Sequence, residues 1–288
     1  MSSAEVVRPS AAGAWLQLAR VSNTPTVISN TVAGAVLAST AAEAGTVAVV
    51  AVAMALFYTA GMILNDLLDF EVDRRERPER PLPSGQVSRG AALAVVVALF
   101  VAGETLLVVE GWEPAVAGLG LIGLIVLYDT WHKGNVFSPV LMGGCRFLVY
   151  VVAALAVAGM VAIEVWTAAA VLLLYIVGLT QVAKAEGSTL LSAWPLAAVL
   201  AAIGYWVGWV DSVWMLVLLV VFAAWVWRAL WLVRGPRRIG EGVVSLIAGV
   251  SLFDALAVAS AGGGIAPVAV CLAAFVLTIA LQTKIAGT

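Results

Sequence analysis

The stretch NDLLDFEVDRRERPERPLPSG, residues 65–85, holds the side chains best suited to chemistry in an otherwise apolar sequence. Its acidic residues are Asp66, Asp69, Glu71, Asp73, Glu76 and Glu79, and its basic residues are Arg74, Arg75, Arg77 and Arg80. If the preceding helix continues, Asn65, Asp69 and Asp73 share one helical face, with Asp66 on the neighbouring row. Carboxylates on one face repel one another unless a cation lies between them, and Mg²⁺ favours such oxygen ligands. The spacing therefore predicts a magnesium site formed by Asn65, Asp66, Asp69 and Asp73.

The arginines in this stretch suit a phosphate group beside that metal. Guanidinium groups bind phosphate oxygens through two hydrogen bonds, so these arginines could face the same phosphate as the metal. The segment RPLPSG at residues 80–85 then closes the loop, because its prolines prevent helix continuation and its glycine permits a sharp turn. The residues alone also allow a solvated charged loop between two membrane spans, held by its own salt bridges.

The elements that must position this stretch are membrane-spanning helices. The chain has 288 residues, of which 63% are hydrophobic and 11% charged, and its mean hydropathy is +1.07. Its apolar runs repeat at roughly twenty residues, the length that a helix needs to cross about 30 Å of hydrocarbon. We therefore expect an integral membrane protein with spans near residues 14–38, 45–65, 90–109, 114–131, 138–158, 162–182, 191–209, 212–232, 241–260 and 265–283. The pair divided at GWVDSVW could instead be one bent element, so nine to ten spans are predicted, in a single domain over residues 1–288.

The basic residues predict how these spans are oriented. With the N-terminus in the cytoplasm and retained as part of the first span, all 15 Lys and Arg residues fall in cytoplasmic segments or at the adjoining helix ends. We therefore expect a multi-pass protein of a bacterial-type cell membrane, with its active site toward the cytoplasm. A net charge of −2 argues against nucleic acid as a partner. Cys145 and Cys271 lie in separate apolar runs and are expected to be packing residues.

The sequence resembles the UbiA superfamily of intramembrane prenyltransferases. The first signature of that family is NDxxDxxxD followed by a basic stretch and RPLPSG, and the matching positions here are Asn65, Asp66, Asp69, Asp73, Arg77 and Arg80. The resemblance extends to Arg20 and Pro25, and to the stretch YDTWHKGNVFSPVLMGGCR at residues 128–146. In that stretch Tyr128, Lys133, Gly144 and Arg146 match the family's positions.

The resemblance implies an all-helical bundle around a central cavity that opens sideways to lipid. Two aspartate-rich segments there would bind Mg²⁺ and a prenyl diphosphate, whose ionisation gives an allylic cation that alkylates an acceptor. The catalytic residues implied are Asp66, Asp69, Asp73 and Lys133. The diphosphate-binding residues implied are Asn65, Arg77, Arg80, Tyr128, Arg146, Lys184 and Glu186.

The family's second signature, a DxxxD motif at the end of the sixth span, is missing. The chain reads VGLTQVAKAEGSTLL at residues 177–191, with no aspartate between Asp129 and Asp211. Three explanations stay open: Lys184 replaces a second metal by binding diphosphate, catalysis is reduced or lost while a lipid diphosphate still binds, or Asp129 supplies the missing carboxylate. This degenerate motif and LFDAL at residues 252–256 resemble UbiA-like members of Ebo gene clusters.

Two more polar residues lie in or beside the apolar runs. Asp254 sits well inside the ninth predicted span, where a carboxylate is costly. It could be protonated, bond to Ser251 or line an acceptor pocket. His132, the only histidine, is expected to lie at the membrane interface or to act as a base.

The sequence thus predicts a Mg²⁺-dependent prenyltransferase that acts on a prenyl diphosphate and an unidentified acceptor in membrane lipid. The alternative is a non-catalytic isoprenoid-diphosphate binder or transport component with the same fold. A CDP-alcohol phosphotransferase is excluded because its DGxxAR signature is absent. The sequence makes no prediction of oligomeric state.

Overall fold

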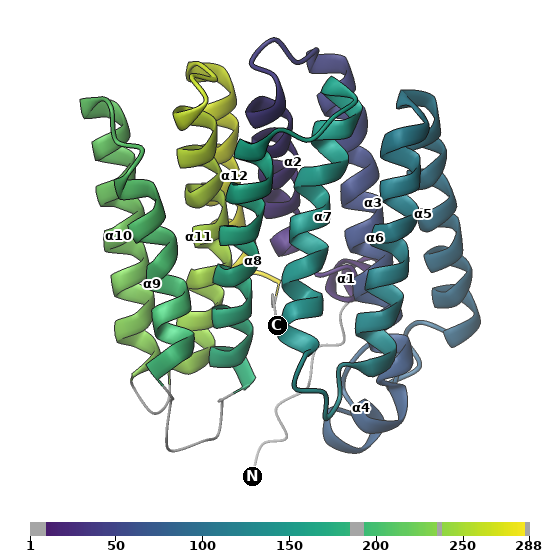
Figure 1. Cartoon of the computed structure of the whole chain (residues 1–288). Helices are drawn as coiled ribbons and strands as arrows, with labels where there is room; N and C mark the ends of the chain where they lie inside the picture. The colour runs from purple at the N-terminus through teal and green to yellow at the C-terminus, as the bar shows by residue number, and fades with distance from the viewer. Residues whose placement is uncertain (1–9, 185–192, 235–237, 286–288) are drawn as a thin grey trace.

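The structure is a computed structural model that describes residues 10–184, 193–234 and 238–285. These residues form an all-helical bundle, so the predicted fold class is confirmed (Figure 1). In chain order the elements are α1 (Ala11–Leu18), the 3₁₀ helix η1 (Val21–Asn23), α2 (Thr24–Ala38), α3 (Ala44–Leu68), α4 (Phe70–Glu76), α5 (Arg89–Glu110), α6 (Trp112–Trp131), α7 (Ser138–Ala158), α8 (Ile163–Lys184), α9 (Ala193–Val207), α10 (Val213–Val233), α11 (Ile239–Ser260) and α12 (Ile265–Gln282).

Within the described ranges, 8 helices are long and apolar enough to cross a membrane: α3, α5, α6, α7, α8, α10, α11 and α12. The helices α2 and α9, with 15 residues each, run alongside them in the bundle (Figure 1). Each predicted span after the first therefore corresponds to one helix. The residues around Asp211 are not helical, so the GWVDSVW segment separates two helices instead of bending one.

The first predicted span, residues 14–38, is broken, although the sequence predicts one continuous span there. Between α1 and α2 the backbone of Arg20 adopts a left-handed conformation, with φ of 42°. A residue with a side chain rarely adopts this conformation because its Cβ crowds the backbone. Pro25 then lies in the first turn of α2, where its missing N–H costs no helical hydrogen bond. The break turns Arg20 away from a continuous helix and toward α3.

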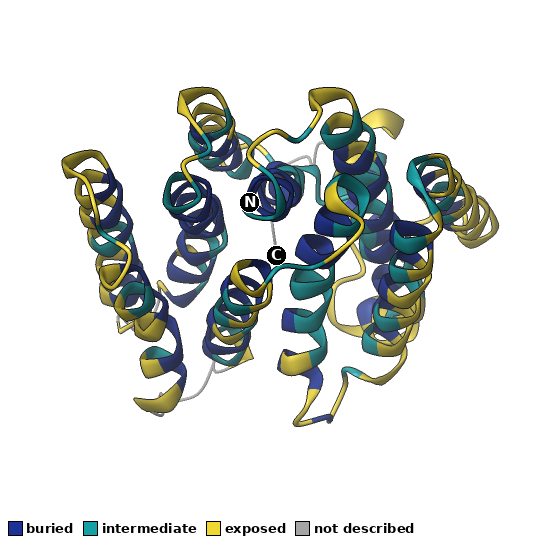
Figure 2. Cartoon of the chain, turned by 45° about the horizontal axis from the view of Figure 1, so that its top comes forward, coloured by how far each residue is buried: buried dark blue, intermediate teal, exposed yellow. Residues whose placement is uncertain are grey.

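Burial follows the expected pattern of a membrane bundle. Buried faces point inward and exposed faces outward, most clearly on α5 at one edge (Figure 2). The outward residues of α5 are large and apolar, namely Leu93, Val97, Val101 and Val108. Such a surface is suited to contact with lipid tails, and the hydroxyl of Thr105, which is exposed on the same helix, donates to the Val101 carbonyl.

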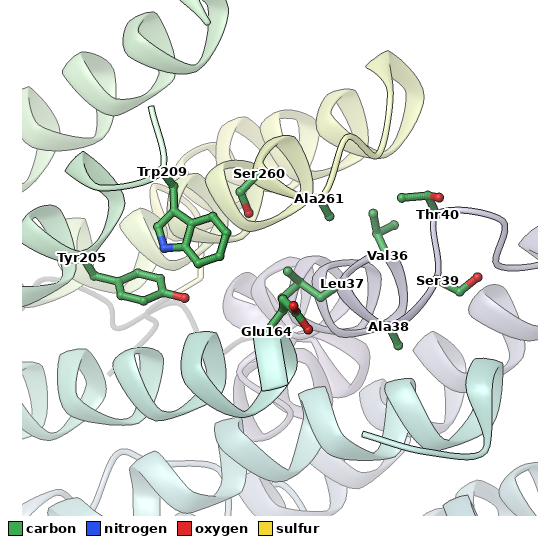
Figure 3. Close-up of a pocket in the computed structure, with 10 residues that line it drawn as sticks. All are labelled: Val36, Leu37, Ala38, Ser39, Thr40, Glu164, Tyr205, Trp209, Ser260 and Ala261. Atoms are coloured by element: carbon green, nitrogen blue, oxygen red, sulfur yellow. The ribbon is translucent and has the colours of Figure 1, made fainter. Parts of the chain in front are cut away.

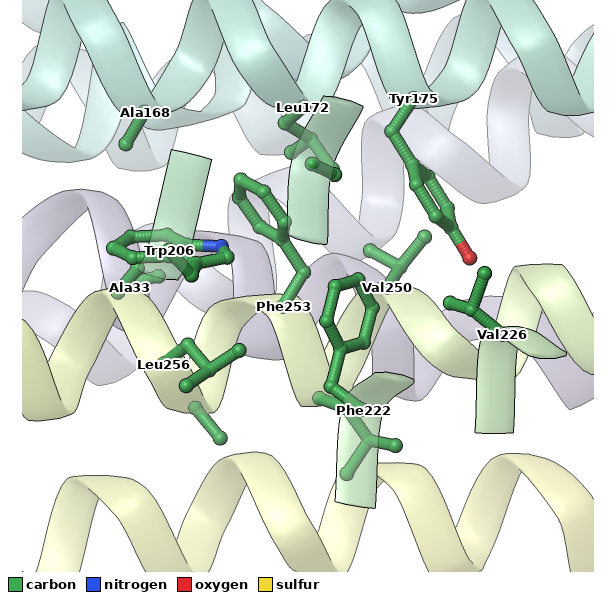
Figure 4. Close-up of a cluster of buried hydrophobic side chains, with 14 of the residues drawn as sticks. Ala33, Ala168, Leu172, Tyr175, Trp206, Phe222, Val226, Val250, Phe253 and Leu256 are labelled. Atoms are coloured by element: carbon green, nitrogen blue, oxygen red, sulfur yellow. The ribbon is translucent and has the colours of Figure 1, made fainter. Parts of the chain in front are cut away.

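An aromatic cluster fixes α11 within the bundle (Figure 4). The Phe253 ring packs edge-on against Trp206 of α9, with centroids 5.1 Å apart, and against Phe222 of α10, with centroids 6.3 Å apart. Edge-to-face contacts of this kind add to the free energy gained by burying the rings. Because side chains of adjacent residues leave a helix in different directions, Asp254 faces another part of the bundle, toward α2 and α7.

A close approach between α2 and α7 completes the frame of the site. A Cβ atom on Gly34 would lie 2.7 Å from the Cα atom of Tyr150, so only glycine fits there. Asn30 lies one turn before Gly34 on α2, and Arg146 lies one turn before Tyr150 on α7. The contact at Gly34 therefore brings Asn30 and Arg146 within hydrogen-bonding distance.

Candidate active site

The junction of α3 and α4 carries the aspartates. The helix α3 ends at Leu68, yet the backbone N–H of Asp69 still donates to the Asn65 carbonyl, and that of Asp73 to the Asp69 carbonyl, both at 2.9 Å. Helical spacing therefore continues across the junction, and Asn65, Asp69 and Asp73 line one cavity, as their spacing predicts. This main cavity has a volume of about 660 Å³.

The main cavity has two chemically different walls. The polar wall comes mostly from η1, the α3–α4 region and the α6–α7 region, and includes Arg20, Asn23, Asn65, Asp69, Asp73, Glu76, Arg77, Arg80, Tyr128, Lys133 and Arg146. The other wall comes from α8 and α11. It is apolar apart from Thr180, and consists of Ile176, Leu179, Thr180, Ala183, Val243, Ile247 and Val250. The α8 residues follow helical spacing, so they form one face of that helix. The cavity thus suits an amphiphilic ligand with an anionic end and an apolar tail.

Basic side chains hold the two aspartates that line the cavity. The Lys133 ammonium lies 2.5 Å from Asp69 Oδ1, and His132 Nε2 lies 3.5 Å from Asp69 Oδ2. The Arg80 guanidinium lies 2.7 Å from Asp73 Oδ2. In the part of the chain that the structure describes, no three acidic, histidine or cysteine side chains are grouped closely enough to hold a metal as they stand. The carboxylates are therefore neutralised by cations of the protein.

Asp66 lies behind the polar wall. Its side chain is buried and contacts Arg20 at 3.0 Å and Arg80 at 3.5 Å, and it does not line the main cavity. Asp66 is therefore absent from the cavity lining, although Arg80 links it to Asp73 and Arg20 links it to Asn65. Its predicted role as a metal ligand stays a prediction. Its geometry is that of a residue that orients the two arginines.

Arg20 is a site residue to which the sequence analysis gave no role. Its guanidinium lines the cavity and reaches Asp66 and, at 3.5 Å, the Asn65 amide oxygen. The sequence feature that could have identified Arg20 as a site residue is its match to the family near the start of the first span. The interruption of the helix at Arg20 could not be predicted from the sequence, because arginine has no preference for a left-handed backbone.

Asp129 of α6 joins the aspartate-rich face from the other side. Asn65 Nδ2 donates to Asp129 Oδ1 at 3.2 Å. The second oxygen, Oδ2, is buried and has no hydrogen-bond partner among the described residues. Asp129 thus lies beside Asn65, while the explanation in which it supplies the missing carboxylate stays a prediction.

A smaller chamber of about 80 Å³ adjoins the main cavity. Both are lined by Tyr58, Met62, Tyr128, Met142 and Arg146. The rest of the chamber is apolar apart from Asp129, with Val27, Met54, Phe57, Gly61, Leu121, Ile125, Cys145 and Val149 around it. Tyr128 stacks on His132 with ring centroids 5.3 Å apart, which fixes the boundary between the two spaces.

Three further predicted diphosphate residues line the main cavity. Arg77 is exposed there, and its guanidinium makes no ion pair within the described residues. Tyr128 and Arg146 lie deeper. Arg146 donates to Asn30 Oδ1 at 2.7 Å and to Thr26 Oγ1 at 3.0 Å, so its position is fixed from behind.

Lys184 does not reach this cavity in the structure. Its ammonium contacts the Ser138 hydroxyl and, at 3.3 Å, the Asn135 carbonyl, so it joins the end of α8 to the start of α7. Neither the cavity nor the smaller chamber is lined by it. The prediction for Glu186 lies outside the described residues.

Asp254 does not line the main cavity or the smaller chamber. Instead it is fully buried and bonded to Ser29, Asn30 and Tyr150, while Ser251 bonds to Ser29. A direct bond to Ser251 was one of the alternatives for Asp254; in the structure the two residues are connected through Ser29 instead.

A separate cavity of about 390 Å³ lies at the opposite end of the bundle (Figure 3). Residues at the end of α2 and the end of α11 line it, together with Glu164, Tyr205 and Trp209. None of the residues matched to the family's motifs lies there. The candidate active site is therefore the main cavity.

The fold and the site define a class: a helical membrane protein whose main cavity pairs an aspartate- and arginine-lined wall with an apolar wall. The chain matches the UbiA prenyltransferase family over residues 27–240. It belongs to that family.

Curated relatives share parts of the chain. Digeranylgeranylglyceryl phosphate synthase of Methanopyrus kandleri is 34% identical over 138 residues, which are 46% of this chain and 50% of the relative. The protein of the same name from Methanoregula boonei is 40% identical over 84 residues, or 28% of this chain and 29% of the relative. The chain therefore spans half or less of the length of these relatives.

Solved structures share the fold along most of the chain. A digeranylgeranylglyceryl phosphate synthase has a TM-score of 0.64 at 18% identity, over 87% of this chain and 98% of that one. A UbiA homologue from Archaeoglobus fulgidus, bound to DMAPP and Mg²⁺, has a TM-score of 0.56 at 13% identity, over 94% and 99% of the two chains. At these identities the comparisons show the fold.

Proposed function

We propose that this protein is a Mg²⁺-dependent prenyltransferase, which transfers an isoprenoid group from a prenyl diphosphate to an acceptor. One observation carries the proposal: Asn65, Asp69 and Asp73 line the same cavity as Arg77, opposite an apolar wall of α8 and α11. An aspartate-rich face suits a metal diphosphate, and the apolar wall suits an isoprenoid chain. Family membership and the relatives named above support the same reaction class.

The donor atoms of the site are of the type that magnesium binds, but Asp69 and Asp73 would first have to leave Lys133 and Arg80 and draw together around it. Asp69 and Asp73 offer carboxylate oxygens in the cavity, and the unpartnered oxygen of Asp129 lies beside Asn65. Mg²⁺ prefers such oxygens and keeps positions for substrate phosphate. When bound, it would supply positive charge that stabilises the departing diphosphate. Asn65, Asp69, Asp73 and Asp129 are the residues that would hold it.

The basic residues would then change partners. Lys133 and Arg80 neutralise Asp69 and Asp73 in this structure. Once a metal diphosphate occupies the cavity, their charges can turn to the phosphate oxygens, as can Arg77, which has no acidic partner to leave. Arg146 would bind the same group from the deeper side of the cavity. These cations stabilise the negative charge that develops as the bond to the isoprenoid breaks.

The apolar residues have a separate task in this proposal. An allylic cation survives only where water is excluded. Ile176, Leu179 and Ile247 form the part of the wall along which the isoprenoid chain would lie, and the smaller chamber at Phe57 offers further apolar space.

The face of α8 that lines the cavity carries no acidic residue, which bears on the missing signature. Asp129 approaches the metal-binding face from α6 instead. We therefore favour one metal group on α3, α4 and α6 over a second metal site on α8. As predicted from the basic residues, the site would face the cytoplasm of a bacterial-type cell.

The competing function is a protein that binds an isoprenoid diphosphate without reacting it. The apolar face of α8 favours this alternative, because it lacks the second group of carboxylates that the family resemblance implies. Both functions require donor binding in the main cavity. They differ only in whether diphosphate is released.

The test measures diphosphate release and donor binding separately. Purified protein is incubated with allylic diphosphates of several chain lengths and a membrane lipid extract as the acceptor source, with Mg²⁺ or with a chelator. We expect release by the wild type with Mg²⁺ and background release by Asp69→Asn/Asp73→Asn. Equal background release by both, with retained binding of a non-hydrolysable donor analogue, would establish the binder instead.

A further inference from the structure

Asp254 is a buried carboxylate that receives donors from two neighbouring helices. Its exposed fraction is 0%. From α2, Ser29 Oγ donates at 2.5 Å and Asn30 Nδ2 at 2.8 and 2.9 Å; from α7, the Tyr150 hydroxyl donates at 2.5 Å. A carboxylate inside a membrane span is costly and usually marks function. Here both carboxylate oxygens accept hydrogen bonds from side chains of two neighbouring helices.

Asp254 determines which way the Asn30 amide faces. An amide has a donor end and an acceptor end. Because the NH₂ group of Asn30 donates to Asp254, its Oδ1 atom points away, and there it accepts from Arg146 Nη1 at 2.7 Å. With the opposite amide orientation, donors would face each other at Arg146. The three residues therefore form an ordered relay.

The relay ends at the candidate active site. Arg146 lines both the main cavity and the smaller chamber, whereas Asp254 lines neither. The second Nη atom of Arg146 donates to Thr26, whose own hydroxyl donates to the Asn23 carbonyl. The close contact at Gly34 holds α2 and α7 together one turn away. One guanidinium is thus fixed at the cavity by two bonds from α2.

We propose that Asp254 is a positioning residue that holds the Arg146 guanidinium toward the cavity through Asn30. It also places a negative charge near a largely desolvated cation, which lowers the cost of keeping Arg146 in the membrane. The inference rests on the proposed function, in which Arg146 binds the diphosphate of the donor. Asp254 itself touches no substrate.

A reciprocal exchange of the two residues tests the relay. Asp254→Asn replaces one carboxylate oxygen by an amide NH₂ group. One of the side chains that donate to Asp254 then has no acceptor. Asn30→Asp places two carboxylates side by side. In Asn30→Asp/Asp254→Asn the introduced amide can donate to the introduced carboxylate, which still accepts from Arg146. Net charge and the direction of the bonds from Arg146 to position 30 and on to position 254 are then restored. One hydroxyl, that of Ser29 or Tyr150, still loses its carboxylate acceptor, which is why the recovery expected below is not complete.

The measurement is the affinity of the monodisperse protein for a non-hydrolysable prenyl thiolodiphosphate with Mg²⁺, together with KM and kcat. We expect each single variant to bind about tenfold more weakly or worse, as loss of a charge-assisted hydrogen bond would produce. The double variant should return to within about threefold of wild type. KM should change more than kcat, because the relay positions a donor-binding group.

Two tyrosines provide a matched comparison. Tyr150 and Tyr175 are both fully buried, and each donates its hydroxyl to α11, Tyr150 to Asp254 and Tyr175 to the Leu246 carbonyl. Tyr150→Phe should weaken donor binding by about threefold, and Tyr175→Phe should leave it unchanged. Similar effects of the two changes would indicate packing alone and overturn the inference.

The possible results separate the inference from the proposed function. Folded single variants that bind the analogue as wild type does would overturn the relay alone. If the single variants do not fold, the double variant decides: wild-type affinity supports the relay, and affinity reduced about tenfold overturns it. A wild-type protein that binds no prenyl diphosphate would overturn the proposed function and the inference with it.

Discussion

The Asn65 amide donates to the Asp129 carboxylate at 3.2 Å, which joins the aspartate-rich end of α3 to α6. The other Asp129 oxygen is buried without a partner in the described part of the chain. A buried polar atom without a partner is costly, so a ligand that satisfies it gains that energy. Under the proposed function, Asp129 would therefore lie beside the metal.

Asp129→Asn should therefore weaken the response to magnesium. We expect the Mg²⁺ concentration for half-maximal diphosphate release to rise by about tenfold, because one charged oxygen ligand is lost. Glu104→Gln is the matched control, since Glu104 also has a buried oxygen without a partner in the described chain and does not line the main cavity. An unchanged Mg²⁺ requirement in Asp129→Asn would remove Asp129 from the metal group.

Arg77→Ala should raise KM for the prenyl diphosphate by about tenfold, because Arg77 faces the cavity with no acidic partner among the described residues. Arg74→Ala is the comparison, because Arg74 pairs with Glu71 at 3.4 Å on the exposed side of α4. Steady-state kinetics at fixed Mg²⁺ check the prediction. Equal effects of the two changes would indicate a general charge effect.

The left-handed backbone at Arg20 gives a prediction about stability. Arg20→Ala and Arg20→Gly remove the same ion pair with Asp66, but only glycine adopts a φ of 42° without strain. We expect Arg20→Gly to be more stable than Arg20→Ala by about 1 kcal/mol. Thermal unfolding in one detergent gives the order. A lower Tm for the glycine variant would contradict the strained conformation.

Gly34→Ala should destabilise the bundle and weaken donor binding together. The added methyl group would meet the Tyr150 backbone at 2.7 Å, so α2 must move from α7 and the bond from Arg146 to Asn30 must lengthen. Gly123→Ala is the control, because a Cβ there meets no atom within 4 Å. Thermal unfolding and analogue binding check both effects. Equal behaviour of the two variants would argue against the close approach.

The sequence predicted most of the bundle, and it grouped three of the polar residues that line the main cavity. Apolar run lengths located the helices, because crossing hydrocarbon imposes a minimum length. Helical spacing placed Asn65, Asp69 and Asp73 on one cavity, because the hydrogen bonds of α3 continue into α4. These are local properties, which a single segment determines.

The remaining relationships depend on contacts between distant segments. Asn30 and Asp254 meet across 224 positions of the chain, and Asn65 and Asp129 across 64. Nothing in the spacing of polar residues identifies such pairs, because they result from how whole helices pack. The position of Lys184 could not be predicted for the same reason. Its motif position suggested a role in binding diphosphate, but its ammonium contacts the start of α7 and does not line the main cavity.

The most direct test of the central claim follows a labelled isoprenoid from its diphosphate into the lipid phase. Membranes carrying wild-type protein or Asp69→Asn/Asp73→Asn receive the labelled donor with Mg²⁺, and the lipid-extractable product is separated from unreacted donor and free alcohol. We predict a new labelled product with the wild type alone, and its loss when Mg²⁺ is chelated. The same products from both proteins, or none from either at saturating donor, would contradict it.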